Sequence, residues 1–230
     1  MTVRINATFE DNIVRHGPLK GMKYPQKASA GSELYPKLLG SYEAELTNTI
    51  NFILKQDYST ILDIGCAEGY YAVGIGMKMP HARIIAYDTD ETALKLCQQM
   101  AQLNNVSIKI EGFCTEDTII SLQLKTKSLI ISDCEGYESE LFTSGLCSSL
   151  RSHDLLIECH DFIDINITPQ LLRRLSQTHT VEIIESIDDI SKAYEYDYPE
   201  LQNFNLEERR AILAECRPQI MRWIFASANT

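Results

Sequence analysis

The residues best suited to chemistry lie in one short stretch of this 230-residue chain, where an apolar run leads into two carboxylates and two glycines. The run Thr60–Ile64 is typical of a buried parallel strand, and a glycine turn and an apolar helix follow it. Asp63 and Glu68 flank the turn made by Gly65 and Gly69. Two carboxylates would repel a pyrophosphate, but they suit a ligand with a cationic end and hydroxyl groups. S-adenosylmethionine (SAM) has both features.

Polar residues also follow four later apolar segments. In chain order these residues are Asp88, then Gly112-Phe113-Cys114-Thr115, Asp133-Cys134-Glu135-Gly136 and Glu158-Cys159-His160-Asp161. Because ligands of open α/β sheets bind beyond the carboxyl ends of the strands, and buried charges are costly unless paired, this accumulation indicates a site. Asp88 follows the glycine turn by about twenty residues, the spacing of a carboxylate that binds ribose hydroxyls. Cys114 and Thr115 could pack on a purine.

Asp133, Glu158 and His160 form the candidate catalytic group. An imidazole titrates near neutral pH, so His160 is a candidate general base, with Asp133 orienting the acceptor. The same three side chains could instead hold a divalent metal such as Mg²⁺. Simpler interpretations stay open, since Asp88 and Asp133 could cap turns or helices and His160 could be a surface histidine. Cys66, inside the glycine turn, is expected to be a small buried side chain rather than a nucleophile.

Alternating apolar strands and amphipathic helices must position these side chains. The pattern predicts strands at residues 60–64, 83–87, 106–110, 128–132, 155–159, 181–185 and 220–226. It predicts helices at residues 34–55, 69–79, 91–103, 116–122, 137–150, 168–178 and 206–216. Strands separated by helices of these lengths indicate an α/β fold with a doubly wound, mainly parallel sheet. The last two strands are expected to form an antiparallel hairpin at the sheet edge.

Two segments fall outside this alternation. Residues 1–59 are predicted to be an N-terminal arm and helix, and residues 60–230 a SAM-binding core with an insertion at about 187–218. The arm is either a mobile terminus or a lid over the substrate. A lid is suggested by a cationic cluster made of Arg15, His16, Lys20 and Lys23. In the insertion, Arg217 is a candidate contact for an anionic acceptor, or simply a surface or helix-end residue.

The composition is that of an ordinary globular protein, with 44% hydrophobic and 23% charged residues. A net charge of −11 argues against a nucleic-acid partner, because such binding depends on basic surfaces. Seven irregularly spaced cysteines indicate reduced intracellular thiols. No apolar signal segment or membrane-length apolar run is visible in the sequence. We therefore expect a cytoplasmic protein without a membrane partner.

The order of these features resembles that of class I SAM-dependent methyltransferases. More narrowly, residues 63–71 (DIGCAEGYY) resemble the D-x-G-A-N-x-G-Y-Y signature of FkbM-type methyltransferases. Residues 133–138 (DCEGYE) are similar to the D-x-E-G-x-E segment of that family, and residues 156–160 (LIECH) to its next strand. The resemblance covers about residues 60–165. It departs from the family where Cys66-Ala67-Glu68 replaces Ala-Asn-x.

The resemblance implies a Rossmann-like methyltransferase fold, with a seven-stranded sheet whose last strand is antiparallel. It places the methionine part of SAM at the glycine turn, which consists of Asp63, Gly65, Cys66, Glu68 and Gly69. It places the ribose at Asp88 and the adenine near Thr89, Cys114 and Thr115. Asp133 would face the sulfonium and the acceptor.

We therefore expect SAM-dependent methyl transfer to a hydroxyl, or to a nitrogen, of a small-molecule or glycosyl-type acceptor, with His160 as the base. The alternative is a SAM-binding scaffold or regulatory module without catalysis. Such a module would not need the group formed by Asp133, Glu158 and His160. An NAD-linked oxidoreductase is disfavoured by Glu68 in the turn and by the lack of G-x-G-x-x-G. The sequence leaves a monomer and a homodimer both open.

Overall fold

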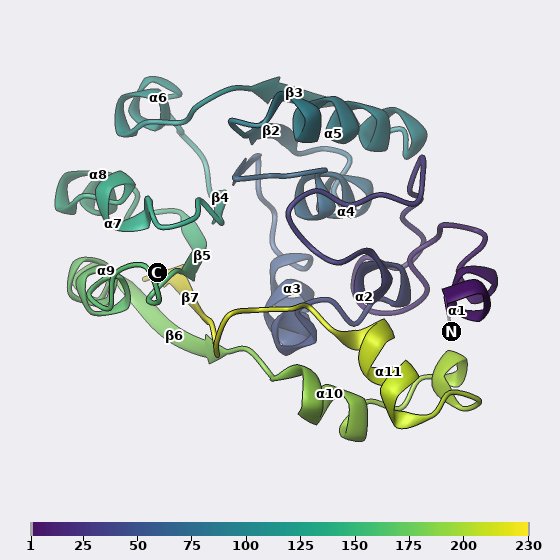
Figure 1. Ribbon diagram of the computed structural model, residues 1–230. Helices are drawn as coiled ribbons and strands as arrows, with labels where there is room; N and C mark the ends of the chain where they lie inside the picture. Colours follow the sequence, from purple (N-terminus) through teal and green to yellow (C-terminus); the bar gives the residue numbers. More distant parts are fainter. Residues whose placement is uncertain (1, 230) are drawn as a thin grey trace.

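The computed structural model describes residues 2–229, which fold around a seven-stranded sheet with helices on both faces (Figure 1). The strand order is β3-β2-β1-β4-β5-β7-β6. The strands are β1 (Thr60–Ile64), β2 (Arg83–Tyr87), β3 (Ile108–Glu111), β4 (Ser128–Ser132), β5 (Asp154–Cys159), β6 (His179–Glu185) and β7 (Arg222–Ala228). The winding direction reverses between β1 and β4, so a crevice is expected beyond the carboxyl ends of these two strands.

Strands β1 to β5 form the parallel part of the sheet, with β1 between β2 and β4. Every residue of β1 and β4 is buried, as their continuous apolar sequences predict for strands covered on both faces. Strand β7 runs antiparallel to both β5 and β6. The predicted sheet, with an antiparallel last strand and a hairpin at one edge, is therefore confirmed.

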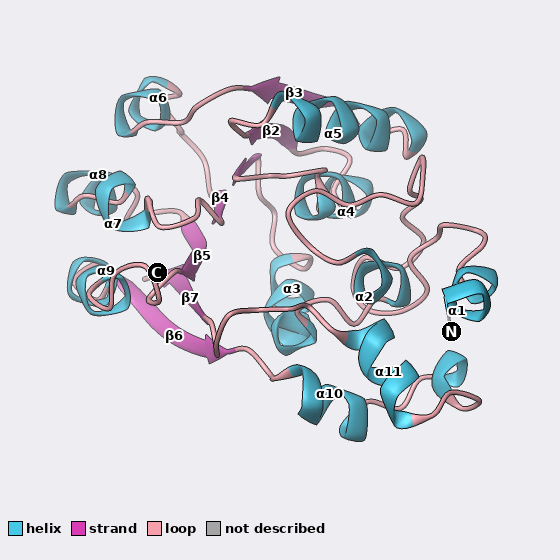
Figure 2. Ribbon diagram, in the orientation of Figure 1, coloured by secondary structure: helices cyan, strands magenta, loops and turns pink. Residues whose placement is uncertain are grey.

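Alternate residues of the central strands supply two separate cores. Ile61 belongs to a core with side chains of α2 to α5, and Leu62 to a core with side chains of α6 to α9 (Figure 2). The helices are α1 (Thr2–Thr8), α2 (Leu34–Leu39), α3 (Thr47–Ile53), α4 (Tyr70–Lys78), α5 (Glu91–Leu103), α6 (Glu116–Ser121), α7 (Glu138–Leu141), α8 (Ser144–Ser149), α9 (Ile167–Leu175), α10 (Asp189–Glu195) and α11 (Leu206–Leu213). Among the helices of residues 2–229, none combines the length and apolar character that a membrane span requires.

Two predicted helices are interrupted. The region predicted as one helix over residues 34–55 contains α2, a short 3-10 helix (Ala44–Leu46) and α3, because Gly40 adopts a left-handed conformation with φ of 87° and ends α2. The region predicted as one helix over residues 137–150 is split into α7 and α8. Thr143 causes this break, since its side chain accepts a hydrogen bond from the backbone N–H of Leu146 at 3.1 Å and starts a new helix.

The N-terminal arm packs on the core instead of extending from it. Phe9, Met22 and Tyr24 are buried within the same core as Ile61. Its cationic cluster contacts the insertion between β6 and β7: Arg15 lies 3.5 Å and His16 2.9 Å from the carboxylate of Glu200. Figure 1 shows α1 beside the α10–α11 region, where Arg4 lies 3.7 Å from Glu208.

Candidate functional site

A cavity of about 360 Å³ opens at the carboxyl ends of β1 to β4. Its volume lies in the range typical of cofactor and small-molecule sites. Of the predicted cofactor-binding residues, the wall includes Asp63, Gly65, Cys66, Asp88, Thr89, Cys114 and Asp133 and leaves out Glu68, Gly69 and Thr115. The N-terminal segment also contributes to the wall, through residues 30–32, Lys37 and Tyr42. None of Arg15, His16, Lys20 and Lys23 belongs to it, and the role of the arm as a lid stays a prediction.

The two glycines of the turn are required by close packing inside the protein. Gly65 has φ of 80°, and a Cβ there would lie 1.7 Å from the backbone oxygen of Asp133. Gly69 has φ of 91°, precedes α4, and would place a Cβ 2.7 Å from Sγ of Cys97. Any side chain at Gly65 would therefore push the end of β1 away from the end of β4, which is the crevice that the cavity occupies.

Asp63 lies buried at the base of this turn. Its carboxylate accepts a hydrogen bond from the backbone N–H of Ala72 at 2.8 Å. Burial raises the pKa of Asp63 to about 7, because the hydrogen bond from Ala72 only partly offsets the loss of water. A cationic ligand group in the cavity would favour the ionised form of this side chain.

Asp88 is held rigidly between the glycine turn and α5. One carboxylate oxygen accepts the backbone N–H of Ala67 and the other accepts that of Asp90, both at 2.8 Å. Asp90 caps α5 by accepting the backbone N–H of Thr92 at 2.7 Å. Asp88 is thus not the cap of the helix, and the remaining lone pairs of its carboxylate are available to ligand hydroxyls. Its contact with ribose stays a prediction.

The β3 side of the cavity is aromatic. The ring centroids of Phe113 and Tyr137 are 5.4 Å apart, and 59% of Phe113 is exposed. Cys114 lies in the wall with a thiol whose pKa burial raises to about 12, so it stays neutral. Thr115 faces away, because its side chain caps α6 by accepting the backbone N–H of Thr118 at 3.2 Å.

Cys66 lies in the wall beside Gly65. The pKa of its thiol is raised by a hydrogen bond with Cys97 and by burial. A thiol of raised pKa is a poor nucleophile. The expectation that Cys66 is a small buried side chain therefore agrees with its environment.

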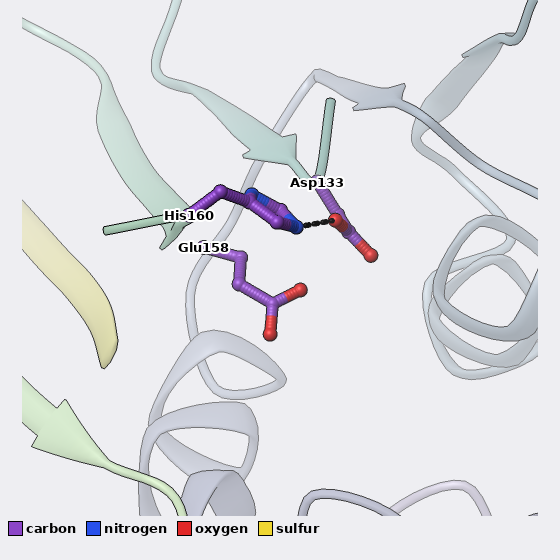
Figure 3. A group of neighbouring side chains, drawn as sticks. All are labelled: Asp133, Glu158 and His160. Atoms are coloured by element: carbon purple, nitrogen blue, oxygen red, sulfur yellow. Dashed lines mark ion pairs between the residues drawn. The ribbon is translucent and has the colours of Figure 1, made fainter. Parts of the chain in front are cut away.

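Asp133 and His160 meet at the carboxyl ends of β4 and β5 (Figure 3). Nε2 of His160 lies 3.5 Å from Asp133 and 3.4 Å from Glu135. Nδ1 of His160 contacts Glu138 at 2.7 Å. Asp133 reaches the cavity, whereas His160 is 3% exposed and lies behind it, so the interpretation of His160 as a surface histidine was wrong.

The titration of this pair is set by opposing effects. Burial raises the pKa of Asp133 to about 7. For His160, burial favours the neutral ring, but the hydrogen bond and charge of Glu138, with the charges of Glu158 and Glu135, outweigh it and raise the pKa above its ordinary value. Two groups of raised pKa, Asp133 and His160, therefore stand in line from the cavity wall inward.

Glu158 is ion-paired with Arg217. Ligand atoms of Asp133, Glu158 and His160 all lie within 4.8 Å of one another, as the sequence suggested. The guanidinium of Arg217, however, donates to Glu158 and to Glu43, and also to Glu215 at 2.9 Å. A divalent cation would lie beside this guanidinium and compete with it for the carboxylate, so the residues fit a metal poorly.

Glu68 is the predicted ligand residue whose position differs most from expectation. Its carboxylate is fully buried and accepts Nζ of Lys37 at 2.5 Å. Lys37 is itself 2% exposed, and its ammonium lies 4.8 Å from the ring centroid of Tyr42. Nothing in the local sequence predicts the partners of Lys37, Glu138 and Arg217, because those partners lie 31, 22 and 59 positions away.

The model of the methyltransferase small domain family matches residues 47–133, which run from α3 to the end of β4. This match contains the glycine turn, Asp88 and Asp133. A search against curated proteins found no significant match.

Solved structures of similar fold include several methyltransferases. A Klebsiella pneumoniae protein provisionally described as an O-methyltransferase has a TM-score of 0.56 and 11% identity, and the alignment covers 99% of this chain and 90% of that one. A cofactor-bound protein from MTB has a TM-score of 0.55 and 10% identity over 99% and 88% of the two chains. TomG of Streptomyces achromogenes, an O-methyltransferase of tomaymycin synthesis in complex with SAM, has a TM-score of 0.52 and 10% identity over 85% and 83%.

These similarities establish the fold. The chain has the Rossmann-like fold of class I methyltransferases, with the seven-stranded sheet and antiparallel last strand that the sequence predicted. None of these similarities concerns the FkbM-type group, and that finer assignment stays a prediction.

Proposed function

We propose that this protein is a SAM-dependent methyltransferase that acts on a hydroxyl, or a nitrogen, of a small-molecule or glycosyl-type acceptor. The observation that carries the proposal is a cavity whose wall holds both Asp88, the residue predicted to bind ribose, and Asp133, backed by His160. The class I fold and the family match over residues 47–133 support it.

The cavity residues fit SAM in charge and shape. Asp63 and Asp133 are carboxyl groups whose ionised forms a sulfonium or ammonium would stabilise. Asp88 offers acceptor oxygens to hydroxyls, and the apolar surface of Phe113 and Tyr137 suits a purine. When bound, SAM supplies an electrophilic methyl group on its sulfonium.

The protein must orient the acceptor and remove its proton. In our proposal, Asp133 contacts the acceptor group at the cavity wall, and the proton passes to the pair formed by Asp133 and His160. Glu138, 2.7 Å from Nδ1 of His160, stabilises the imidazolium that results. His160 thus acts as the base from behind Asp133, because its ring is buried.

The charges around the cavity argue for a neutral or cationic acceptor. Asp88, Asp133 and Glu135 line it, whereas the ammonium of Lys37 is paired with Glu68. Arg217, the sequence-based candidate for an anionic acceptor, is already bound to three glutamates. No metal step is part of this proposal.

Methyl transfer can be tested with purified protein, SAM carrying a deuterated methyl group, and neutral glycosides, phenols, amines and the small-molecule fraction of a cell extract as acceptors. We expect S-adenosylhomocysteine (SAH) to form together with a labelled product detected by mass spectrometry. Asp133→Asn should slow transfer by about 100-fold or more, the usual contribution of a positioned acid or base. Binding of SAM without SAH formation from any of these acceptors would instead support the non-catalytic scaffold.

A further inference from the structure

The carboxylate of Glu68 joins the glycine turn to the N-terminal segment. Four donors from residues 24–37 converge on it: Nζ of Lys37 at 2.5 Å, Oγ of Ser29 at 2.9 Å, the hydroxyl of Tyr24 at 3.1 Å and the backbone N–H of Ala30 at 3.1 Å. All four donors belong to the N-terminal segment, so the hydrogen bonds of the Glu68 carboxylate require no side chain from the rest of the core. A buried carboxylate with this many donors, one of them cationic, is fully compensated for the loss of water.

The charge state of Glu68 agrees with this arrangement. Burial alone opposes ionisation, but the charge and hydrogen bond of Lys37 and the N–H of Ala30 outweigh it and lower the pKa of Glu68. Lys37 is held in turn by Oγ of Ser29 at 3.0 Å and by the rings of Tyr42 and Tyr70, 4.8 and 5.4 Å away. The ion pair is thus buried among side chains, with Lys37 also reaching the cavity wall.

The segment held by this carboxylate forms one wall of the cavity. Residues 30–32, Lys37 and Tyr42 line it opposite the strand ends. Residues 25–33 form no helix or strand, and Gly31 has open space on its Cβ side. Besides the bonds of Ser29 and Ala30 to Glu68, the segment is held by Nζ of Lys37, which donates to Oγ of Ser29 at 3.0 Å, and by Nζ of Lys27, which donates to the backbone oxygen of Asn6 at 2.8 Å. Glu68 itself does not line the cavity.

We propose that Glu68 is a positioning residue for the cofactor: its ion pair with Lys37 fixes residues 29–32 as the wall that closes the SAM cavity. This inference rests on the proposed function, since it takes SAM as the ligand of the cavity. In this proposal Glu68 holds the wall of the cavity in position, whereas the sequence suggested that it contacts the cofactor directly.

Glu68→Gln tests the inference, because the amide keeps the size of the side chain but leaves the ammonium of Lys37 unpaired. SAH binding is measured by calorimetry, and cleavage by trypsin at the exposed Lys27 is followed by mass spectrometry. If the wall is ordered in about one variant molecule in ten, the apparent affinity for SAH falls about tenfold. We also expect cleavage without ligand to be faster than in the wild type, and SAH to protect the wild type from it.

Two further variants separate positioning from general loss of stability. Glu68→Gln combined with Lys37→Met removes both charges at similar volume and should recover part of the lost affinity. Tyr58→Phe removes the hydrogen bond to the buried Asp154 at the opposite end of the sheet, and should lower stability without changing SAH affinity or cleavage at Lys27.

The inference is overturned if Glu68→Gln binds SAH and is cleaved as the wild type is, or if Tyr58→Phe reproduces both of its effects. If the wild type binds no SAH but Glu68→Gln is still cleaved faster, the proposed cofactor fails while the role of Glu68 in holding residues 29–32 stands.

Discussion

Two buried ionic clusters flank the cavity, and they differ in charge balance. At the glycine turn, one carboxylate, Glu68, faces one ammonium, Lys37, and the pKa of Glu68 is lowered. At the ends of β4 and β5, Arg217 pairs with Glu43, Glu158 and Glu215, and Lys192 also pairs with Glu215, so two cations face three carboxylates. There, burial and the charge of Asp133 raise the pKa of Glu158 well above its ordinary value.

The difference separates a structural cluster from one suited to proton transfer. In the balanced pair, the ammonium of Lys37 favours the ionised form of Glu68, and the pair can hold a chain segment in place. In the unbalanced cluster, burial and then the charges of Glu43 and Glu135 raise the pKa of Asp133 to about 7. We therefore expect the two clusters to respond differently to substitution and to pH.

The largest expected effect is on stability, from Arg217→Met. Removing the guanidinium leaves Glu43 and Glu158 buried without a cation, while Glu215 keeps its pair with the buried Lys192, and the free energy of unfolding should fall by about 3–5 kcal/mol. Urea unfolding followed by circular dichroism measures it. The matched control is Arg222→Met, whose pairs with Glu185 and Asp161 are exposed on the arginine side and should cost less than about 1 kcal/mol.

Lys37→Met should have a smaller effect on unfolding, about 2–3 kcal/mol, because Tyr24, Ser29 and Ala30 continue to donate to Glu68. The same urea titration measures it, with the exposed Lys95→Met as control. A loss equal to that of Arg217→Met would contradict the contrast between a balanced and an unbalanced cluster.

The affinity of the protein for SAM should depend on pH around and below pH 7. Asp63 and Asp133 are largely protonated below their pKa of about 7 and ionised above it, so affinity for the sulfonium of SAM should rise a few-fold as pH increases through 7. SAH, which lacks the sulfonium, should change less. Asp133→Asn should reduce the difference between the two ligands, and calorimetry at pH 6 and pH 8 measures it. Equal pH dependence for SAM and SAH would contradict this account.

The smallest expected effect is that of metal removal. Because Arg217 holds Glu158, EDTA or added Mg²⁺ should leave methyl transfer and SAH affinity unchanged. A loss of activity in EDTA that Mg²⁺ restores would show that the cluster of Asp133, Glu158 and His160 binds a metal after all.

The residues at the strand ends could be predicted from the sequence, whereas the two ionic clusters could not. Apolar runs and glycines specify β1, β2 and β4 locally, and parallel strands bring Asp63, Asp88 and Asp133 to one edge of the sheet. The partners of these side chains come from distant segments with no regular pattern. Lys37 has no local pattern that marks it, and Arg217 could be interpreted only as an anion contact or a surface residue, because their partners are set by the packing of the arm and of residues 186–221.

Titration of the purified protein with SAM and SAH by calorimetry tests the central claim most directly. We predict one site per chain with a dissociation constant in the micromolar range, weakened about ten- to 100-fold in Asp88→Ala, because the carboxylate that would hold the ribose is lost. The matched control is Thr143→Ala, which removes the cap of α8 outside the cavity wall and should lower stability by about 1 kcal/mol while changing affinity little. The absence of binding by either compound to the folded wild-type protein would contradict the assignment of the cavity to SAM.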